Sequence, residues 1–406
     1  MPYLTKTLLE GIPWATANPV AAFGVLALLL ICIGMLAQLR RSSANSDIQR
    51  YQWDSGVAGT AKKRWMWDSL RLLREGYFKF YDKPWQVWTS EGYQVVLPPK
   101  YIDELKMLPD HTFPSFLREF MLPKYTFRPF PSWKLDYVNH VILHDMNKNM
   151  GIVSRTKIFP AMRNGVETAL SIEFTTSTDW SEADILTQLA RLTCRASGIA
   201  FVGTELEGNE EWISIGCNVL QQREQDAKIV PGYTKPNDTI QWIHDLIPEE
   251  DKKNYALQGA LQLAITAVSV QSTSKLIANI ILNLMKYTKY APILLEEIET
   301  TLTECGGEWT LESMGRLEKL DSFMRESLRF EPPLTATFQR QVKKPVKLSD
   351  GTILPPGTLV FTPSDAIAFD PNFYPDPETF DGLRFYNLRQ QVEETGQGGS
   401  KLPQKP

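Results

Sequence analysis

The sequence predicts a mainly α-helical protein with a small β-sheet lobe and one N-terminal transmembrane helix. An apolar stretch without charges lies near the N-terminus, and apolar residues recur at helical spacing over several long segments. The alternation typical of strands is confined to three short runs, 85–97, 338–340 and 358–361, the last two joined through a turn at 349–351.

Length and charge narrow the class of protein. The 406 residues fit one large domain or two of ordinary size. Lysine and arginine number 43 and aspartate and glutamate 47, a net charge of −4 with no basic block, so nucleic acid is not an expected partner. The four cysteines are scattered, which favours a reducing, cytosol-facing location over a disulfide framework.

The N-terminal apolar stretch predicts a membrane anchor. No charged residue occurs between Glu10 and Arg40, and residues 19–39 supply the ~20 apolar positions that cross a bilayer as one helix. Arg40 and Arg41 follow at once, so the positive-inside rule places the C-terminal side in the cytosol and residues 1–18 in the lumen. A cleaved signal peptide is the alternative, but it usually has a basic start and a small-residue cleavage site, and neither is clear here.

The next segments carry a linker, a helix and a hairpin. Residues 40–63 are polar and contain glycine and serine, as expected of a linker. An amphipathic helix is expected over 64–76, and its aromatic residues either pack into the core, the plainer interpretation, or dip into the membrane interface. Alternation around Gly92 predicts a hairpin over 85–97, followed by a helix over 100–107.

The middle of the chain carries weaker signals. His140 and His144 are spaced i, i+4 beside Asp145, but structural metal sites use four ligands and no further ligand is recognisable, so a partly exposed helix face is favoured. A helix is expected over 184–194. Asn237 begins a glycosylation sequon, which a domain in the cytosol would leave unmodified.

The longest periodic run after the anchor covers 254–286 and is apolar nearly all round, which predicts a buried helix. Polar residues 269–273 interrupt it midway, and mid-helix hydroxyls commonly bond back to the preceding turn. A second amphipathic helix over 290–305 is expected to end at Gly306 and Gly307. Three acidic residues are expected on its outward face, Glu296, Glu297 and Glu299.

The last part of the chain combines a helix with a proline-rich loop. Residues 317–329 form a helical run in which Glu326 and Arg329 are spaced i, i+3 and therefore share one face. The aromatic-rich stretch 369–385 contains too many prolines for a helix or a central strand, and its Arg384 could reach back to Glu326.

These residues stand in an order that resembles a known family. Glu326-x-x-Arg329 is followed by Pro332-Pro333, Arg340, Gly351-x-x-x-Pro355-x-Gly357 and an Asp-Pro-x-x-Phe/Tyr-Pro run that ends in Arg384-Phe385. The order resembles the cytochrome P-450 superfamily of haem-thiolate monooxygenases, and more closely its membrane-bound fungal members. The resemblance implies a mostly helical domain with a small sheet-rich lobe over 64–389. It also implies that Glu326, Arg329 and Arg384 form a buried charge cluster.

The resemblance implies roles for three further residues. Arg340 has the position from which the family contacts a haem propionate, for which a bidentate contact would be suitable, and a strand-surface arginine is the alternative. Ser272 and Thr273 correspond to the oxygen pocket, where the family uses an acid–alcohol pair. Gln271 stands at the position of the acid and cannot deliver a proton as an acid does, so pocket lining by this helix is favoured over proton relay.

The implied function is the oxidation of a hydrophobic substrate, typically a terpenoid or alkaloid intermediate. Haem is the implied cofactor, and NADPH–cytochrome P-450 reductase is the implied source of electrons. The implied location is the endoplasmic reticulum membrane, with one membrane span and the catalytic domain in the cytosol.

One motif of the family does not occur in these 406 residues. The family continues with Phe-x-x-Gly-x-x-x-Cys-x-Gly, whose thiolate binds the iron, whereas all four cysteines here precede Arg384. Residues 390–406 are polar and glycine-rich, as in disordered tails. We therefore expect a C-terminally truncated member without an iron ligand. Two hypotheses stay open: a monooxygenase whose end is missing here, and a non-catalytic membrane protein or partner of a full-length relative.

Overall fold

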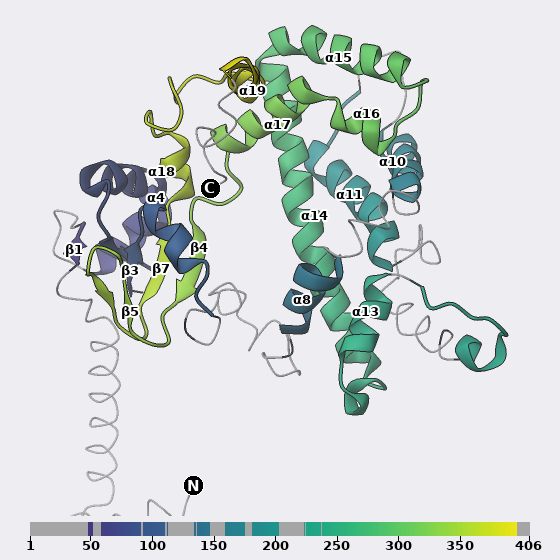
Figure 1. Ribbon diagram of the computed structural model, residues 1–406, viewed down its shortest axis with the longest axis horizontal. Coiled ribbons are helices and arrows are strands. Elements are labelled where there is room, and N and C mark those ends of the chain that lie inside the picture. Colours follow the sequence, from purple (N-terminus) through teal and green to yellow (C-terminus); the bar gives the residue numbers. More distant parts are fainter. Residues whose placement is uncertain are drawn as a thin grey trace, which may run out of the picture. The chain divides into compact units, whose positions relative to one another are not determined.

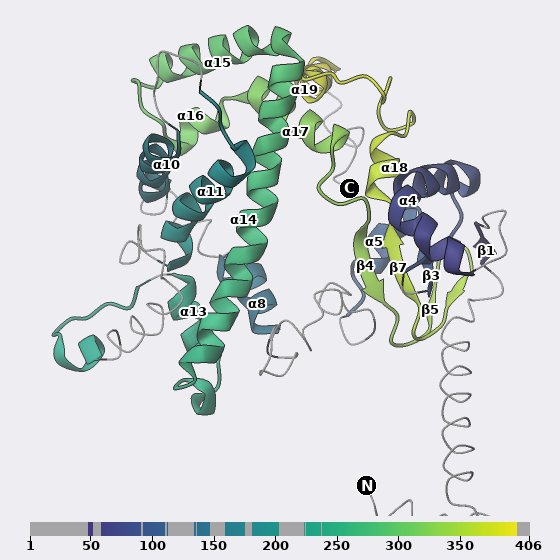
Figure 2. The same cartoon turned by 180° about the vertical axis from the view of Figure 1, so that it is seen from behind.

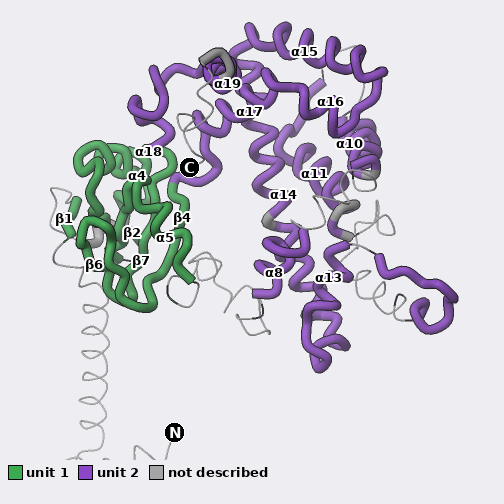
Figure 3. The backbone as a smooth tube through the Cα atoms, viewed as in Figure 1, with its two compact units in different colours: residues 1–117, 336–366 green, residues 118–335, 367–406 purple. Residues whose placement is uncertain are grey.

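The computed structural model describes residues 48–51, 58–90, 92–109, 112, 134, 136–146, 159–174, 181–202, 223, 225–236 and 238–395. The predicted anchor at 19–39 and the end of the predicted tail, 396–406, lie outside the described residues. The chain divides into two compact units, shown in different colours in Figure 3. Unit 1 comprises Met1–Leu117 and Ala336–Ala366, and unit 2 comprises Arg118–Thr335 and Ile367–Pro406.

Unit 1 is built on a five-stranded sheet with the strand order β1-β2-β3-β7-β4. The strands are β1 Gln49–Arg50, β2 Trp85–Thr89, β3 Gly92–Val96, β7 Leu359–Thr362 and β4 Thr337–Gln341. Strands β2 and β3 form the predicted hairpin, in which Thr89 lies opposite Gly92. Strand β3 then pairs in parallel with β7, so the sheet joins segments more than 250 residues apart in the sequence.

The predicted turn at 349–351 does not connect β4 directly to β7. It closes a separate two-stranded hairpin made of β5 Val346–Lys347 and β6 Ile353–Leu354. Pro345 and Pro355 flank these strands, and proline cannot donate a ladder hydrogen bond, which is why each strand stays short.

Helix α4 spans Ala58–Phe80, longer at both ends than the predicted 64–76. Residues 58–63, assigned to the linker from their composition, are therefore helical. Gly76 does not end the helix: a Cβ there would lie 2.2 Å from the Trp85 ring, so glycine lets α4 pass over the indole. Leu72 and Leu73 are fully buried and pack against the sheet, beside which Figure 2 shows α4. The predicted helix over 100–107 is shorter, with η1 Pro99–Tyr101 and α5 Ile102–Leu105.

Unit 2 is helical and is arranged along α14 (Figure 1). Its elements are α8 Asp136–His140, η3 Val141–Met146, α10 Phe159–Glu173, α11 Ile185–Val202, α13 Thr239–Leu246, η6 Glu249–Asp251, α14 Tyr255–Lys286, η7 Thr288–Tyr290, α15 Ala291–Glu304, α16 Leu311–Gly315, α17 Glu318–Phe330 and α19 Arg384–Thr395. The short helix α18, Ser364–Ala368, lies where the chain passes from unit 1 to unit 2. The mainly helical fold with a small sheet region is therefore confirmed.

Helix α14 begins where predicted, because the Asn254 side chain accepts a hydrogen bond from the Leu257 backbone N–H at 3.2 Å and caps the helix. The prediction of a buried helix is wrong for part of its surface. Leu261 and Ile265 lie in the core of unit 2, whereas Met285 is 69% exposed. Within the described part of the chain, α14 is the one helix long and apolar enough to cross a membrane by length and composition alone.

Three boundaries or orientations differ from the predictions. Helix α11 continues to Val202 instead of ending near 194, because Ala196 and Phe201 remain buried on its inner face. Glu297 does not face outward: its carboxylate accepts the backbone N–H groups of Lys319 at 2.7 Å and Leu320 at 2.9 Å, at the start of α17. Helix α19 continues to Thr395, past the predicted start of the tail at 390.

Candidate functional site

The candidate site is centred on the carboxylate of Glu326. Helix α17 places Arg329 one turn further along the same face, and its Nε and Nη2 donate to the two oxygens of Glu326 at 2.8 Å each. Glu326 is fully buried and Arg329 is 5% exposed. This bidentate, charge-assisted contact is stronger than a neutral hydrogen bond, and burial protects it from screening by solvent.

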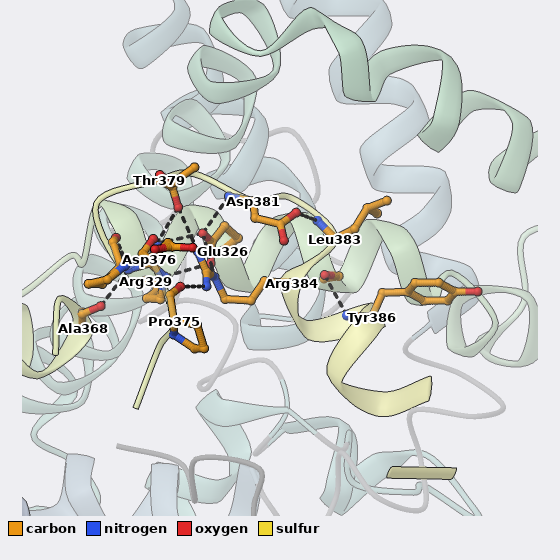
Figure 4. A network of polar contacts seen from close by, with 12 residues as sticks. Glu326, Arg329, Ala368, Pro375, Asp376, Thr379, Asp381, Leu383, Arg384 and Tyr386 are labelled. Atoms are coloured by element: carbon orange, nitrogen blue, oxygen red, sulfur yellow. Dashed lines mark hydrogen bonds and ion pairs between the residues drawn. The ribbon is translucent and has the colours of Figure 1, made fainter. Parts of the chain in front are cut away.

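Arg384 completes the cluster from the first residue of α19 (Figure 4). Its Nε donates to the two oxygens of Glu326 at 3.2 and 3.1 Å, and the backbone N–H of Asp381 donates to the same carboxylate at 2.9 Å. The structure thus brings together Glu326, Arg329 and Arg384, the three residues that the sequence motifs selected. The sequence pattern did not include Asp381.

The two guanidinium groups also hold the backbone of the proline-rich loop. Arg329 donates to the carbonyl groups of Ala368 at 2.7 Å and Pro377 at 2.9 Å. Arg384 donates to those of Pro375 at 2.5 Å and Thr379 at 2.9 Å. A loop without regular structure cannot pair its own buried carbonyl groups, so these donors replace a hydrogen-bond ladder.

Aromatic rings surround the cluster. The guanidinium carbon of Arg329 lies 5.5 Å from the ring centres of Phe330 and Phe369 and 5.3 Å from that of Tyr374. Burial raises the pKa of the Tyr374 hydroxyl, and the positive charge of the nearby Arg329 offsets only part of this increase. The loop's Phe380 stacks on Tyr287 at 4.3 Å, so aromatic contacts fix the loop against the end of α14.

Ser272 and Thr273 lie on α14 and are not part of this cluster. Both are exposed, and the Ser272 hydroxyl lies 3.3 Å from the backbone oxygen of Ser269, in the preceding turn. Gln271 is also exposed. The neighbouring Ser274 is buried and bonds back to Val270 at 2.7 Å, as mid-helix hydroxyls commonly do.

Arg340 lies on β4, in unit 1. Its Nη1 donates to the Gln339 carbonyl at 2.9 Å, and its guanidinium lies 4.7 Å over the Phe338 ring. The register between β4 and β7 shifts here, and Phe338 has a φ of +52°, a left-handed conformation that is uncommon for a bulky residue. The sequence carried no signal for this bulge.

The two histidines of the middle segment lie close together, with 4.5 Å between the ring centres of His140 and His144. Among the described residues, no group of three or more histidine, cysteine, aspartate or glutamate side chains is placed to hold a metal ion.

Neither described cysteine stands in a Phe-x-x-Gly-x-x-x-Cys motif, the one from which the family binds the haem iron. Cys194 lies within α11, and burial raises the pKa of its thiol, which therefore stays protonated near neutral pH. Cys305 follows the last residue of α15. Cys32 and Cys217 lie outside the described residues, and no cysteine follows Arg384 in the sequence. No chemical step through haem is therefore assigned to these residues.

Comparison with known proteins identifies the class. The family model of cytochrome P-450 matches residues 235–398, which include the whole charge cluster. A cytochrome P-450 monooxygenase of Aspergillus clavatus is 30% identical over 383 residues, covering 82% of this chain and 75% of that protein. Pyrichalasin C-7 hydroxylase of Pyricularia grisea is 28% identical, with 81% and 74% covered. The chain belongs to the cytochrome P-450 family.

The solved structures agree on the fold. The cytochrome P-450 CYP102L1 superposes with a TM-score of 0.61 at 14% sequence identity, covering 84% of each chain. Retinoic-acid-bound cyanobacterial CYP120A1 gives a TM-score of 0.55 at 16% identity.

Proposed function

We propose that this chain is the major part of a monooxygenase that oxidises a hydrophobic fungal secondary metabolite of the terpenoid or alkaloid class. The observation that carries the proposal is the buried cluster of Glu326, Arg329 and Arg384, which holds the proline-rich loop in a chain similar to fungal monooxygenases. When bound, haem would supply the activation of dioxygen in this family.

We also propose roles for the three other residues that the sequence motifs selected. Arg340 would contact a haem propionate, with its guanidinium already supported by the Phe338 ring. Ser272 and Thr273 would line the oxygen pocket on α14. NADPH–cytochrome P-450 reductase would deliver electrons at the cytosolic face of the endoplasmic reticulum.

We propose that a polypeptide of only these 406 residues is inactive when expressed alone, because the Phe-x-x-Gly-x-x-x-Cys motif is not among them. A second candidate is a non-catalytic membrane protein or a partner of a full-length relative. Reading the coding DNA past codon 406 separates the two. A Phe-x-x-Gly-x-x-x-Cys segment in frame or after a splice site would support the monooxygenase, and its absence would support the second candidate.

Turnover tests the proposed activity. The polypeptide is expressed with a flavoprotein reductase in yeast microsomes, alone and extended by the C-terminal segment of a fungal relative. NADPH-dependent product from a panel of terpenoids and alkaloids is expected only with the extended chain. Product from the 406-residue chain would contradict the proposed inactivity, and no product from either chain would argue against the proposed substrate class.

Cell fractionation tests the proposed location. The full chain is expected to pellet with microsomes and to resist extraction with alkaline carbonate, because residues 19–39 would span the bilayer. A chain beginning at Ala58, the first residue of α4, is the control and should be far more soluble. Full-length protein in the soluble fraction would contradict the anchor.

A further inference from the structure

Two exposed histidines lie at the junction of α8 and η3 in unit 2. Helix α8 ends at His140, and η3, which follows at once, contains His144. The ring centres are 4.5 Å apart and the ring planes are inclined by 40°. Apart from this ring contact, neither imidazole has a hydrogen-bond or ion-pair partner among the described residues. The ring nitrogens are therefore open to a ligand from solvent.

The backbone beneath the two histidines is held by packing. Element η3 is a π-helix, and π-helices are rare, occur mostly as single turns and are frequent at functional sites. On the inner side, Val138 and Val141 are buried in a core cluster with residues of α13 and α14. Figure 2 shows α8 beside α14. The two imidazoles thus project from a supported helical segment, which reduces the entropy lost when they bind a common ligand.

The spacing of the rings suits one shared metal ion. A zinc–imidazole bond is about 2.0–2.1 Å long, so two nitrogens that bind the same ion lie at most ~4.2 Å apart. Each nitrogen lies at the edge of its ring, so ring centres 4.5 Å apart permit this separation. Two histidines at i, i+4 on one helix bind a single zinc ion in the His-Glu-x-x-His metalloproteases, which shows that this spacing in the chain is sufficient for two ligands.

The charges near the pair favour a cation. Elements α8 and η3 carry two carboxylates, Asp136 and Asp145, and no lysine or arginine. Lys134, two residues before α8, forms an ion pair with Asp251, and this carboxylate balances its charge. A divalent cation at the two imidazoles therefore meets no unbalanced positive charge from α8, η3 or Lys134.

We propose that His140 and His144 bind a divalent ion of the late first-row transition metals, with Cu²⁺ bound more tightly than Ni²⁺ and water completing the coordination. Imidazole suits copper, nickel and zinc, and the affinity of a given site rises toward Cu²⁺. Among the described residues no third ligand is in place, so the site is exchangeable, unlike a structural zinc site with four protein ligands. The spacing in the sequence favoured a helix face without metal, and the π-helix and the ring distance change that interpretation. The proposal does not depend on the proposed enzymatic activity.

Metal titration of the full chain tests the proposal. The protein is purified in detergent without a histidine tag, stripped with EDTA and titrated with Cu²⁺ or Ni²⁺ in a calorimeter. One ion per chain is expected at this site, with Cu²⁺ bound more tightly. His140→Asn and His144→Asn should each weaken binding at least about tenfold, because even the loss of a group that only supports a ligand commonly costs 10–100-fold in metal affinity. Pulsed electron paramagnetic resonance of the Cu²⁺ form should detect two imidazole ligands in the wild type and one in each variant.

Matched variants separate metal binding from folding. His244→Asn is the control, because the Nδ1 atom of His244 on α13 already lies 3.1 Å from the Gln258 side-chain oxygen, and this variant should bind metal as the wild type does. Urea unfolding in EDTA checks that His140→Asn and His144→Asn are folded, as expected for exposed side chains. Copper affinity that is unchanged in both variants would overturn the proposal and place the ion on a cysteine or another histidine. So would a wild-type spectrum with fewer than two imidazole ligands, whether or not the variants fold.

Discussion

At Glu326, a buried negative charge is balanced by two guanidinium groups and one backbone N–H. A buried carboxylate without partners is costly, so each donor matters more than an equivalent contact on the surface would. The same two arginines also pair the carbonyl groups of the loop, and losing one of them leaves both the carboxylate and the loop short of donors.

Replacing Arg384 by alanine is therefore expected to destabilise the protein by roughly 3–5 kcal/mol, the usual cost of breaking a buried ionic cluster. Arg389→Ala is the matched control on the same helix. The Arg389 ion pair with Asp321 is partly exposed, at 27% and 43%, and should contribute less than about 1 kcal/mol. Urea unfolding midpoints measure both variants. Equal losses would show that burial of the cluster does not contribute to stability.

Gly76 offers a second test at single-residue scale. Gly76→Ala would bring a methyl group within 2.2 Å of the Trp85 ring, and we expect a loss of roughly 1–3 kcal/mol from overpacking. Gly198→Ala is the control: Gly198 is also helical, but nothing lies within 4 Å of its added Cβ, so a gain of about 0.4–1 kcal/mol is expected. Thermal unfolding compares them, and a stabilised Gly76→Ala variant would mean that α4 does not pack on Trp85 as described.

Between elements, α19 is attached to α17 by a mixture of polar contacts. Arg389 contacts Asp321 at 2.6 Å, and the Tyr386 backbone N–H donates to the Ser322 hydroxyl at 3.0 Å. Burial by itself would raise the pKa of Asp321, but hydrogen bonds and charges from Arg325 and Arg389 outweigh it and hold the pKa below its ordinary value. Such a group stabilises the folded state only while it is ionised.

The lowered pKa of Asp321 predicts that its contribution to stability depends on pH. Because the folded-state pKa of Asp321 is depressed, its contribution is present above the unfolded value of 3.8 and is lost as the pH falls through the folded value. Asp321→Asn should therefore cost stability at about pH 6 and cost progressively less toward about pH 3. Urea unfolding across this range measures the difference between the variant and the wild type. A difference that stays constant with pH would contradict the ion-pair assignment.

The elements that the sequence predicts best are those fixed by local rules. Helix α14 follows from its apolar period and its Asn254 cap, α15 ends at Gly306 and Gly307, and the β2–β3 hairpin follows from alternation around Gly92. Elements set by distant contacts are harder. The sequence pattern predicted that the helix over 64–76 ends at Gly76. The structural reason for this glycine is the indole of Trp85, nine residues further on, which the local pattern does not reveal.

The candidate site likewise contains residues that the sequence predicted and contacts that it could not predict. The order of the motifs selected the three charged side chains, because i, i+3 spacing places Glu326 and Arg329 on one face. The carbonyl acceptors from 368 to 379 were not predictable, because every residue contributes a carbonyl group and only the folded loop decides which point inward. The left-handed Phe338 under Arg340 is likewise a product of strand register, which composition does not specify.

At the scale of the whole molecule, the chain combines a cytochrome P-450 fold with a buried charge cluster on the proline-rich loop. The cluster keeps the proline-rich loop folded on α17, within the part of the chain that the cytochrome P-450 family model matches. We propose that a polypeptide of only these 406 residues differs from an active monooxygenase in thiolate ligation of the iron.

The carbon monoxide difference spectrum of the reduced, haem-supplemented protein tests this claim most directly, because it reports the axial ligand and needs no substrate. The 406-residue polypeptide is expected to lack the Soret band of a thiolate-ligated haem. The same polypeptide extended by a relative's Phe-x-x-Gly-x-x-x-Cys segment should show that band. A thiolate-type band from the 406-residue polypeptide itself would contradict the account.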